Sequence, residues 1–267
     1  MLSYQLMKLY SCLKTQERKV DMLNFIIAGP CAISSSQEAL DIAHELKTIS
    51  LDVDIPIIYK GSFDKANRSD LHSPRGVGLH EGLAILEQIK NETGLEVSTD
   101  VHEMSHIEPV AAVCDMIQIP ALLSRQTDLI VTAAATGRKV NVKYGQCLAV
   151  NRHNLNMLLK KAGLGAYVTY RGTAYGGSTL IDYKSLHTLV HCYSNMIFDA
   201  SHSIHDAVIS EQVASAALRL GIGALFFEVH PDPQSAICDG RTSVRLGEFK
   251  AMVKRLQKVE TVSSLWQ

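Results

Sequence analysis

Length, composition and charge narrow the class of this chain before any motif is considered. The chain has 267 residues, of which 46% are hydrophobic and 20% charged, and its formal net charge is −1. A single (β/α)8 barrel needs about 250 residues, so a second full domain is not expected. No apolar run approaches the roughly 20 residues of a membrane span, and the near-zero charge provides no general field for nucleic acid. We therefore expect neither a membrane nor a nucleic-acid partner.

The cysteines and the N-terminal segment bear on location and domain organisation. The six cysteines are scattered, without CxxC pairs or the regular spacing of a disulfide scaffold, and this usage predicts a reducing, cytoplasmic location. Residues 1–22 contain several basic residues and lack the uninterrupted apolar core of a signal peptide. We expect an N-terminal extension over 1–22, packed on the barrel floor, and one catalytic barrel domain over 23–267.

Short apolar runs recur along the chain and alternate with segments of helical period. The expected strands are 23–28, 56–60, 95–100, 115–119, 139–143, 166–170, 195–199 and 224–229. Most are continuous apolar runs, as is typical of parallel strands covered by helices. Helical periodicity appears, for example, at 37–49, 79–89, 155–164 and 211–220. Eight such units predict a (β/α)8 barrel. The alternative is an open doubly wound sheet, but its GxGxxG fingerprint does not follow the first strand.

Polar and reactive residues follow every expected strand. In a (β/α)8 barrel the chemistry lies at the C-terminal strand ends, so these side chains should share one site. In chain order they are Cys31; Lys60 with Lys65, Asn67 and Arg68; Asp100 and His102; Gln118 with Arg125; Lys143; Arg171; Asp199 and His202; and Glu228 with His230.

Two groups within this set suggest different ligands. Six cations at one mouth would repel each other without bound anions, which favours phosphate or carboxylate ligands. These cations are Lys60, Lys65, Arg68, Arg125, Lys143 and Arg171. The second group, Cys31, His202, Glu228 and Asp239, offers the donor types of one divalent transition metal. Because these four residues are far apart in the sequence, a structural interpretation stays open, with Cys31 as a small buried residue and His202 as a histidine that hydrogen-bonds the backbone. Cys114, Cys147, Cys192 and Cys238 are assigned no role.

Several motifs resemble the 3-deoxy-D-manno-octulosonate 8-phosphate (KDO8P) synthases, also called 2-dehydro-3-deoxyphosphooctonate aldolases. The resemblance covers residues 24–250, and its most specific motifs are KANRS at 65–69 and IPALLSRQTDL at 119–129. Further motifs are IAGPC at 27–31, TDVHE at 99–103, NVK at 141–143, FDASH at 198–202, EVHPDP at 228–233 and CDG at 238–240. The related 3-deoxy-7-phosphoheptulonate synthases share part of this set and are the alternative.

The resemblance implies a transferase that condenses phosphoenolpyruvate with D-arabinose 5-phosphate and water, releasing inorganic phosphate, in the synthesis of the lipopolysaccharide sugar KDO. It implies Lys60, Lys65, His102 and Lys143 as catalytic residues, and Asn67, Arg68, Ser69, Asp100, Gln118, Arg125 and Arg171 as substrate contacts. Arg125 would reach a neighbouring subunit's site in a homotetramer. Cys31 matches the metal-dependent branch, in which Zn²⁺, Fe²⁺ or Mn²⁺ would be bound with His202, Glu228 and Asp239.

Three departures from the family pattern keep other functions open. The segment after His202 lacks about ten residues of the loop that closes sites of this kind. Tyr144 follows the NVK motif where a polar residue is expected, and the sequence around Arg171 is altered. A changed acceptor sugar, or a barrel that binds phosphorylated ligands without turnover, therefore remains an alternative.

Overall fold

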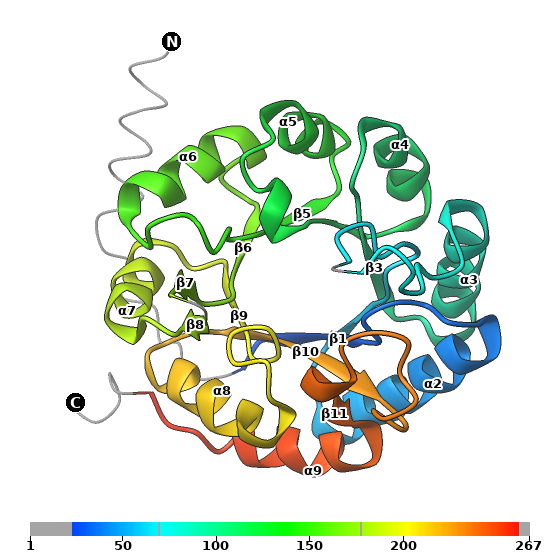
Figure 1. The fold of residues 1–267 in the computed structure, drawn as a ribbon. Helices are drawn as coiled ribbons and strands as arrows, with labels where there is room; N and C mark the ends of the chain where they lie inside the picture. The colour runs from blue at the N-terminus through cyan, green and yellow to red at the C-terminus, as the bar shows by residue number, and fades with distance from the viewer. Residues whose placement is uncertain (1–22, 69, 177, 262–267) are drawn as a thin grey trace.

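Parallel strands form a closed barrel in the computed structural model, which describes residues 23–68, 70–176 and 178–261 (Figure 1). The barrel strands are β1 (Phe25–Gly29), β2 (Ile57–Lys60), β3 (Glu96–Asp100), β4 (Met116–Ile119), β5 (Lys139–Lys143), β6 (Tyr167–Tyr170), β9 (Met196–Asp199) and β10 (Ala224–His230). Each pairs in parallel with the next, and β1 pairs with β10 to close the sheet. The predicted (β/α)8 barrel is confirmed, and the open sheet is excluded.

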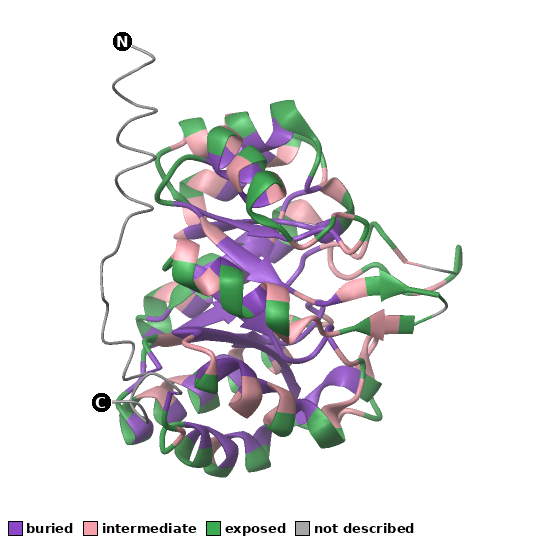
Figure 2. Cartoon of the chain, turned by 90° about the vertical axis from the view of Figure 1, so that its left-hand side faces the viewer, coloured by how far each residue is buried: buried purple, intermediate pink, exposed green. Residues whose placement is uncertain are grey.

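Helices surround the barrel and cover its outer face. They are α2 (Ser36–Val53), α3 (Leu79–Thr93), α4 (Met104–Val113), α5 (Thr127–Ala135), α6 (Arg152–Ala162), α7 (Tyr183–Cys192), α8 (Ser210–Arg219) and α9 (Leu246–Leu256). Short 3₁₀ helices are η1 (Ala121–Leu123), η2 (Ala207–Ile209) and η3 (Gly240–Thr242). Figure 2 shows buried strands enclosed by helices whose outer faces are exposed. None of these described helices is long and apolar enough to cross a membrane.

Local side chains fix where several helices begin and end. The Ser35 hydroxyl accepts a hydrogen bond from the Glu38 amide at the start of α2, and the Asn151 and Asp182 side chains cap α6 and α7 in the same way. The α3 helix ends at Gly94, whose φ of 65° suits the left-handed conformation of a C-terminal cap. The N-terminal caps of α2, α6 and α7 therefore mark where the preceding loops end and the helices begin.

A hairpin that was not predicted projects from the barrel mouth. The strands β7 (Thr173–Tyr175) and β8 (Ser178–Leu180) pair in antiparallel fashion just after β6 (Figure 2). A short strand, β11 (Val244–Arg245), also extends the sheet beyond β10. Residues 1–22 lie outside the described part of the chain, so the N-terminal extension stays a prediction.

The close approach of β1 and β2 gives a first testable prediction. A Cβ added at Gly29 would lie 2.0 Å from the backbone oxygen of Lys60, so Gly29→Ala must push the two strands apart. We expect it to lower the free energy of unfolding by about 1–3 kcal/mol, measured by urea denaturation. The control is Gly247→Ala in α9, where no atom lies within 4 Å and stability should be unchanged or slightly raised. Equal stability of Gly29→Ala and the parent would contradict the prediction.

Candidate active site

A polar cavity of about 370 Å³ lies at the C-terminal ends of the barrel strands. It collects most of the residues that the sequence singled out. Those lining it are Lys60, Lys65, Asn67, Arg68, Asp100, His102, Gln118, Lys143, Arg171, His202, Glu228 and Asp239. Because they come from β2, β3, β4, β5, β10 and the loops that follow the strands, the expectation of one shared site holds for this set.

Four predicted residues that the structure describes are not in the cavity lining: Cys31, Arg125, Asp199 and His230. His230 Nε2 instead lies 3.3 Å from Glu38 Oε2. Arg125 is exposed on the segment between η1 and α5, so it does not serve the cavity of its own chain. Cys31 is buried beside the cavity, where its thiol contacts Asp239. Ser69 lies outside the described residues.

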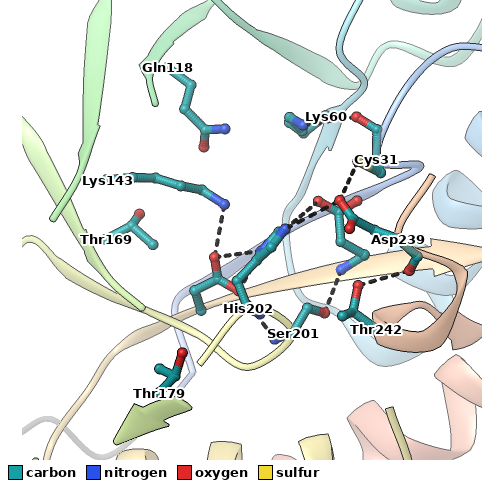
Figure 3. A network of polar contacts seen from close by, with 12 residues as sticks. Cys31, Lys60, Gln118, Lys143, Thr169, Thr179, Ser201, His202, Asp239 and Thr242 are labelled. Carbon is teal, nitrogen blue, oxygen red and sulfur yellow. Dashed lines mark hydrogen bonds and ion pairs between the residues drawn. The ribbon is translucent and has the colours of Figure 1, made fainter. Parts of the chain in front are cut away.

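The predicted metal ligands meet at one side of the cavity. The Cys31 thiol donates to Asp239 Oδ2 at 2.9 Å, and His202 Nε2 lies 3.6 Å from Glu228 Oε1 and 3.9 Å from Asp239 Oδ2. Figure 3 shows Cys31, His202 and Asp239 pointing toward one another. The other Glu228 carboxylate oxygen, Oε2, is buried without a hydrogen-bond partner among the described residues. A soft sulfur, an imidazole and two carboxylates are therefore gathered around a small space.

A second thiol joins this group, although the sequence analysis gave it no role. Potential ligand atoms of Cys31, Cys238 and Asp239 all lie within 4.8 Å of one another. The interaction with Cys238, followed by burial, raises the pKa of the Cys31 thiol well above its usual value. Asp239 adopts a left-handed conformation, with φ of 51°, and its backbone oxygen accepts from the Thr242 hydroxyl at 2.8 Å. Only the position of Cys238 directly before Asp239 could have signalled its place in the cluster.

Lys65 contacts both the thiol and the carboxylate. Its ammonium group is 2.6 Å from both Cys31 Sγ and Asp239 Oδ2. Burial alone would lower the pKa of Lys65, but Cys31, Asp239 and Glu228 together raise it above the usual lysine value. The donor atoms of the cluster thus already attract one positive charge.

Asp199 joins Lys143 to His202 below the cavity. Its carboxylate is fully buried, accepts from Lys143 Nζ at 2.8 Å and lies 2.9 Å from His202 Nδ1. Burial would raise the pKa of Asp199, but His202 and Lys143 hold it well below the usual aspartate value. Because Nδ1 is engaged by Asp199, the Nε2 atom of His202 is directed toward Glu228 and Asp239, an arrangement typical of metal-binding histidines.

A second buried ion pair joins Lys60 to Asp100. The Lys60 ammonium lies 3.1 Å from Asp100 Oδ2 and donates to the Ser62 hydroxyl at 2.7 Å. Ser62 in turn donates to Asp100 Oδ2, and Gln118 Nε2 donates to Asp100 Oδ1 at 2.7 Å. Burial alone would raise the pKa of Asp100, but Lys60 foremost holds it well below the usual aspartate value. Asp100 is therefore an ionised carboxylate in a fixed orientation.

The charge balance differs from the expectation of six mutually repelling cations. Lys60, Lys65 and Lys143 each have an aspartate partner within the protein, and Arg125 is not in the cavity. Arg171 lines the cavity, and its Nε is buried without a hydrogen-bond partner among the described residues. The expectation of strong repulsion is wrong, because carboxylates from other strands neutralise the lysines. Arg171 and Arg68 line the cavity and, unlike these lysines, form no ion pair with a carboxylate of the described residues.

The segment after His202 is short, as the sequence predicts. His205 takes a left-handed conformation, with φ of 55°, and η2 and α8 follow almost at once. The β7–β8 hairpin lies beside this segment, since Ala174, Ser178 and Thr179 line one hollow together with Ile204 and His205. This second hollow has a volume of about 590 Å³ and shares His205 with the cavity. It contains none of the paired lysines.

Comparison with known proteins identifies the family of the chain. Residues 19–264 match the model of the DAHP synthetase I family. The chain belongs to this family. A relative from Cupriavidus necator is 40% identical over 92% of this chain and 92% of its own length, and bears the name 2-dehydro-3-deoxyphosphooctonate aldolase. Proteins of the same name from Geotalea daltonii and Caulobacter vibrioides are 39% and 40% identical, over 89% of this chain and 92% and 88% of their own lengths. The predicted resemblance to the KDO8P synthases is confirmed.

The Lys60–Asp100 pair gives a prediction about stability and pH. A carboxylate whose folded-state pKa is lowered stabilises the fold above its unfolded pKa of about 3.9, and this contribution is lost as the pH falls further. In the parent protein the free energy of unfolding should therefore decline steeply below about pH 4. In Asp100→Asn this decline should be shallower, and stability at pH 7 should fall by about 3–5 kcal/mol because Lys60 loses its buried partner.

Urea denaturation at a series of pH values checks this prediction. The matched control is Glu96→Gln on the same strand, which breaks an exposed pair with Lys139 and should change stability little. The same pH dependence in Asp100→Asn as in the parent would show that Asp100 is not held ionised by its neighbours.

Proposed function

We propose that the chain condenses phosphoenolpyruvate with D-arabinose 5-phosphate and water, forming 3-deoxy-D-manno-octulosonate 8-phosphate and inorganic phosphate. The observation that carries the proposal is the strand-end cavity, which holds paired lysines beside an Arg171 Nε that has no partner among the described residues. Relatives about 40% identical over most of the chain, named 2-dehydro-3-deoxyphosphooctonate aldolase, support it.

The two substrates would occupy different parts of the cavity. Arg171 and Lys143 suit the phosphate and carboxylate of phosphoenolpyruvate, since such anions bind most strongly to charged donors. Asn67 and Arg68 line the cavity from the loop after β2, and with Ser69 they would hold the phosphate of the sugar. This arrangement brings carbon three of the enol toward the sugar aldehyde.

The reaction forms one carbon–carbon bond and breaks one carbon–oxygen bond. Carbon three of phosphoenolpyruvate attacks the aldehyde, water adds to carbon two, and the bond from carbon two to the phosphate oxygen then breaks. Lys60, Lys65, Lys143 and His102 line the cavity, and in this proposal they would move protons and stabilise charge along this path. Burial lowers the pKa of His102 from its usual value, which favours a neutral imidazole able to accept a proton.

A divalent transition metal is proposed at Cys31, His202, Glu228 and Asp239. The residues fit such an ion: the donor types match, Glu228 Oε2 lacks a partner among the described residues, and Lys65 shows that the cluster attracts positive charge. Cys238 supplies a further sulfur nearby. Zn²⁺, Fe²⁺ and Mn²⁺ all suit this mixed set, and any of them would polarise an oxygen of the substrate or water when bound.

A homotetramer is proposed as the active assembly. Arg125 is exposed and does not line the cavity of its own chain, as expected of a residue that serves a neighbouring subunit. Its role at a neighbour's site is inferred from the family resemblance.

Phosphate release tests the proposed reaction. The protein should liberate inorganic phosphate from phosphoenolpyruvate only when D-arabinose 5-phosphate is added, and Arg171→Ala should lose most of this activity because it removes the cation that faces the anion. Release with erythrose 4-phosphate alone would assign the heptulosonate reaction instead. Calorimetric binding of phosphoenolpyruvate without release in either mixture would indicate a binding barrel without turnover.

Metal content tests the proposed cofactor. Cys31→Asn removes the soft ligand and should lower the bound metal of the purified protein about tenfold or more, measured by elemental analysis. The control is Cys147→Asn, at an exposed cysteine, which should retain the metal content of the parent. A chelator should abolish activity, and added divalent metal should restore it. Equal metal in parent and Cys31→Asn, or none in a fully active parent, would refute the site.

A further inference from the structure

A line of buried polar side chains crosses four neighbouring strands beneath the cavity. Asp100, Gln118, Asn141 and Thr169 come from β3, β4, β5 and β6, and the first three are direct partners in the strand register. Asn141 and Thr169 are fully buried, and Gln118 is 1% exposed. Apolar branched residues usually fill the interior of such a barrel, so a continuous polar row there needs a reason.

Each member of the row is hydrogen-bonded to the next. The Thr169 hydroxyl donates to Asn141 Oδ1 at 2.7 Å, and Asn141 Nδ2 donates to Gln118 Oε1 at 3.0 Å. Gln118 Nε2 then donates to Asp100 Oδ1 at 2.7 Å. Figure 3 shows Gln118 and Thr169 on the same side of the site as Lys143. The row therefore links the barrel interior to the Lys60–Asp100 ion pair.

The chemistry of the groups fixes the direction of every bond in this row. An ionised carboxylate only accepts, so Gln118 must turn its amide nitrogen toward Asp100 and its oxygen toward Asn141. Asn141 must then donate with its nitrogen, and its own oxygen is left to accept from Thr169. Reversing any member would place two acceptors against each other in a buried setting.

We propose that Asn141 and Thr169 are positioning residues for the phosphoenolpyruvate site, acting through the Gln118 amide. Gln118 lines the cavity, and only one of its two amide hydrogens is taken by Asp100. Asn141 holds the amide so that the second hydrogen is available to an anionic substrate, and Thr169 holds Asn141. The inference rests on the proposed condensation, since it concerns a substrate contact of that reaction.

Asn141→Asp is the sharpest variant, because it replaces the donor that faces Gln118 Oε1 with an acceptor. The introduced carboxylate and that of Asp100 would then compete for one amide nitrogen. We expect the affinity for phosphoenolpyruvate, measured by calorimetry, to fall about tenfold or more, in line with the loss of a hydrogen bond to a charged group. The Michaelis constant for the sugar phosphate should be unchanged, since the loop after β2 is untouched.

Thr169→Val and Thr169→Ser form a matched pair that adds no buried charge. Valine keeps the shape but removes the hydroxyl, so Asn141 Oδ1 loses its donor, and phosphoenolpyruvate affinity should fall about threefold to tenfold. Serine keeps the hydroxyl and should restore the parent affinity. Ser98→Ala is the control for deleting a buried hydroxyl in the barrel, because Ser98 is fully buried on β3 and its hydroxyl has no partner among the described residues.

The outcomes separate this inference from the proposed function. A selective loss of phosphoenolpyruvate affinity in Asn141→Asp and Thr169→Val, with Thr169→Ser and Ser98→Ala near the parent, supports positioning. If binding of both substrates weakens equally, and in step with the melting temperature of each variant, the row has a purely structural role and the inference is overturned. Unchanged affinity in Thr169→Val overturns it even if Asn141→Asp fails to fold. A parent protein without condensation activity would instead reject the proposed function.

Discussion

The pairing of β1 with β10 is the contact on which the site depends. It sets Gly29 opposite Glu228 in the strand register, although almost two hundred residues separate them in the chain. Cys31, two residues beyond Gly29, then meets Asp239 from the loop after β10. An open sheet of the same strands would leave these groups at opposite edges. The closed barrel is therefore a requirement of the chemistry as well as of the packing.

Charge neutralisation within the protein is the second constraint on this site. The three cavity lysines would each carry a desolvation cost alone, and each is offset by an aspartate from a different strand end. The pairs hold the lysines in place before any ligand arrives, and the aspartates raise the pKa of Lys60 and Lys65, whereas burial keeps the pKa of Lys143 below the usual lysine value. Arg171 differs from these lysines, because its Nε has no partner in the described part of the chain, and in the proposed reaction this cation would meet the anion within a prearranged frame.

The barrel could be predicted from the sequence because each strand is a short apolar run between helical segments. The expected strand at 139–143 matches β5, and the other barrel strands differ by no more than two residues at either end. The β7–β8 hairpin was missed, although two glycines at 176 and 177 are a typical turn signal and Gly176 has φ of 58°. Its strands are too short and too exposed to show a buried pattern.

The sequence predicted which residues lie near the site, but it did not predict which of them form ion pairs with one another. Strand-end position located Lys60, Lys143 and Arg171, since that position follows from the fold alone. The partners of the lysines could not be predicted, because Lys143 and Asp199 are 56 residues apart and meet only through the order of the strands. Cys238 was overlooked for the same reason: its neighbour in space, Cys31, lies at the other end of the chain.

The position of Lys65 has a consequence for how the proposed ion would enter. Its ammonium group occupies the approach to Cys31 Sγ and Asp239 Oδ2, so an incoming ion and this side chain compete for the same two atoms. Loading would release Lys65 toward the cavity as the ion takes its place. Because Lys65 stays at the barrel mouth, the charge of the ion would be offset there only by loss of the Cys31 thiol proton, and the freedom of the loop after β2 would depend on metal occupancy.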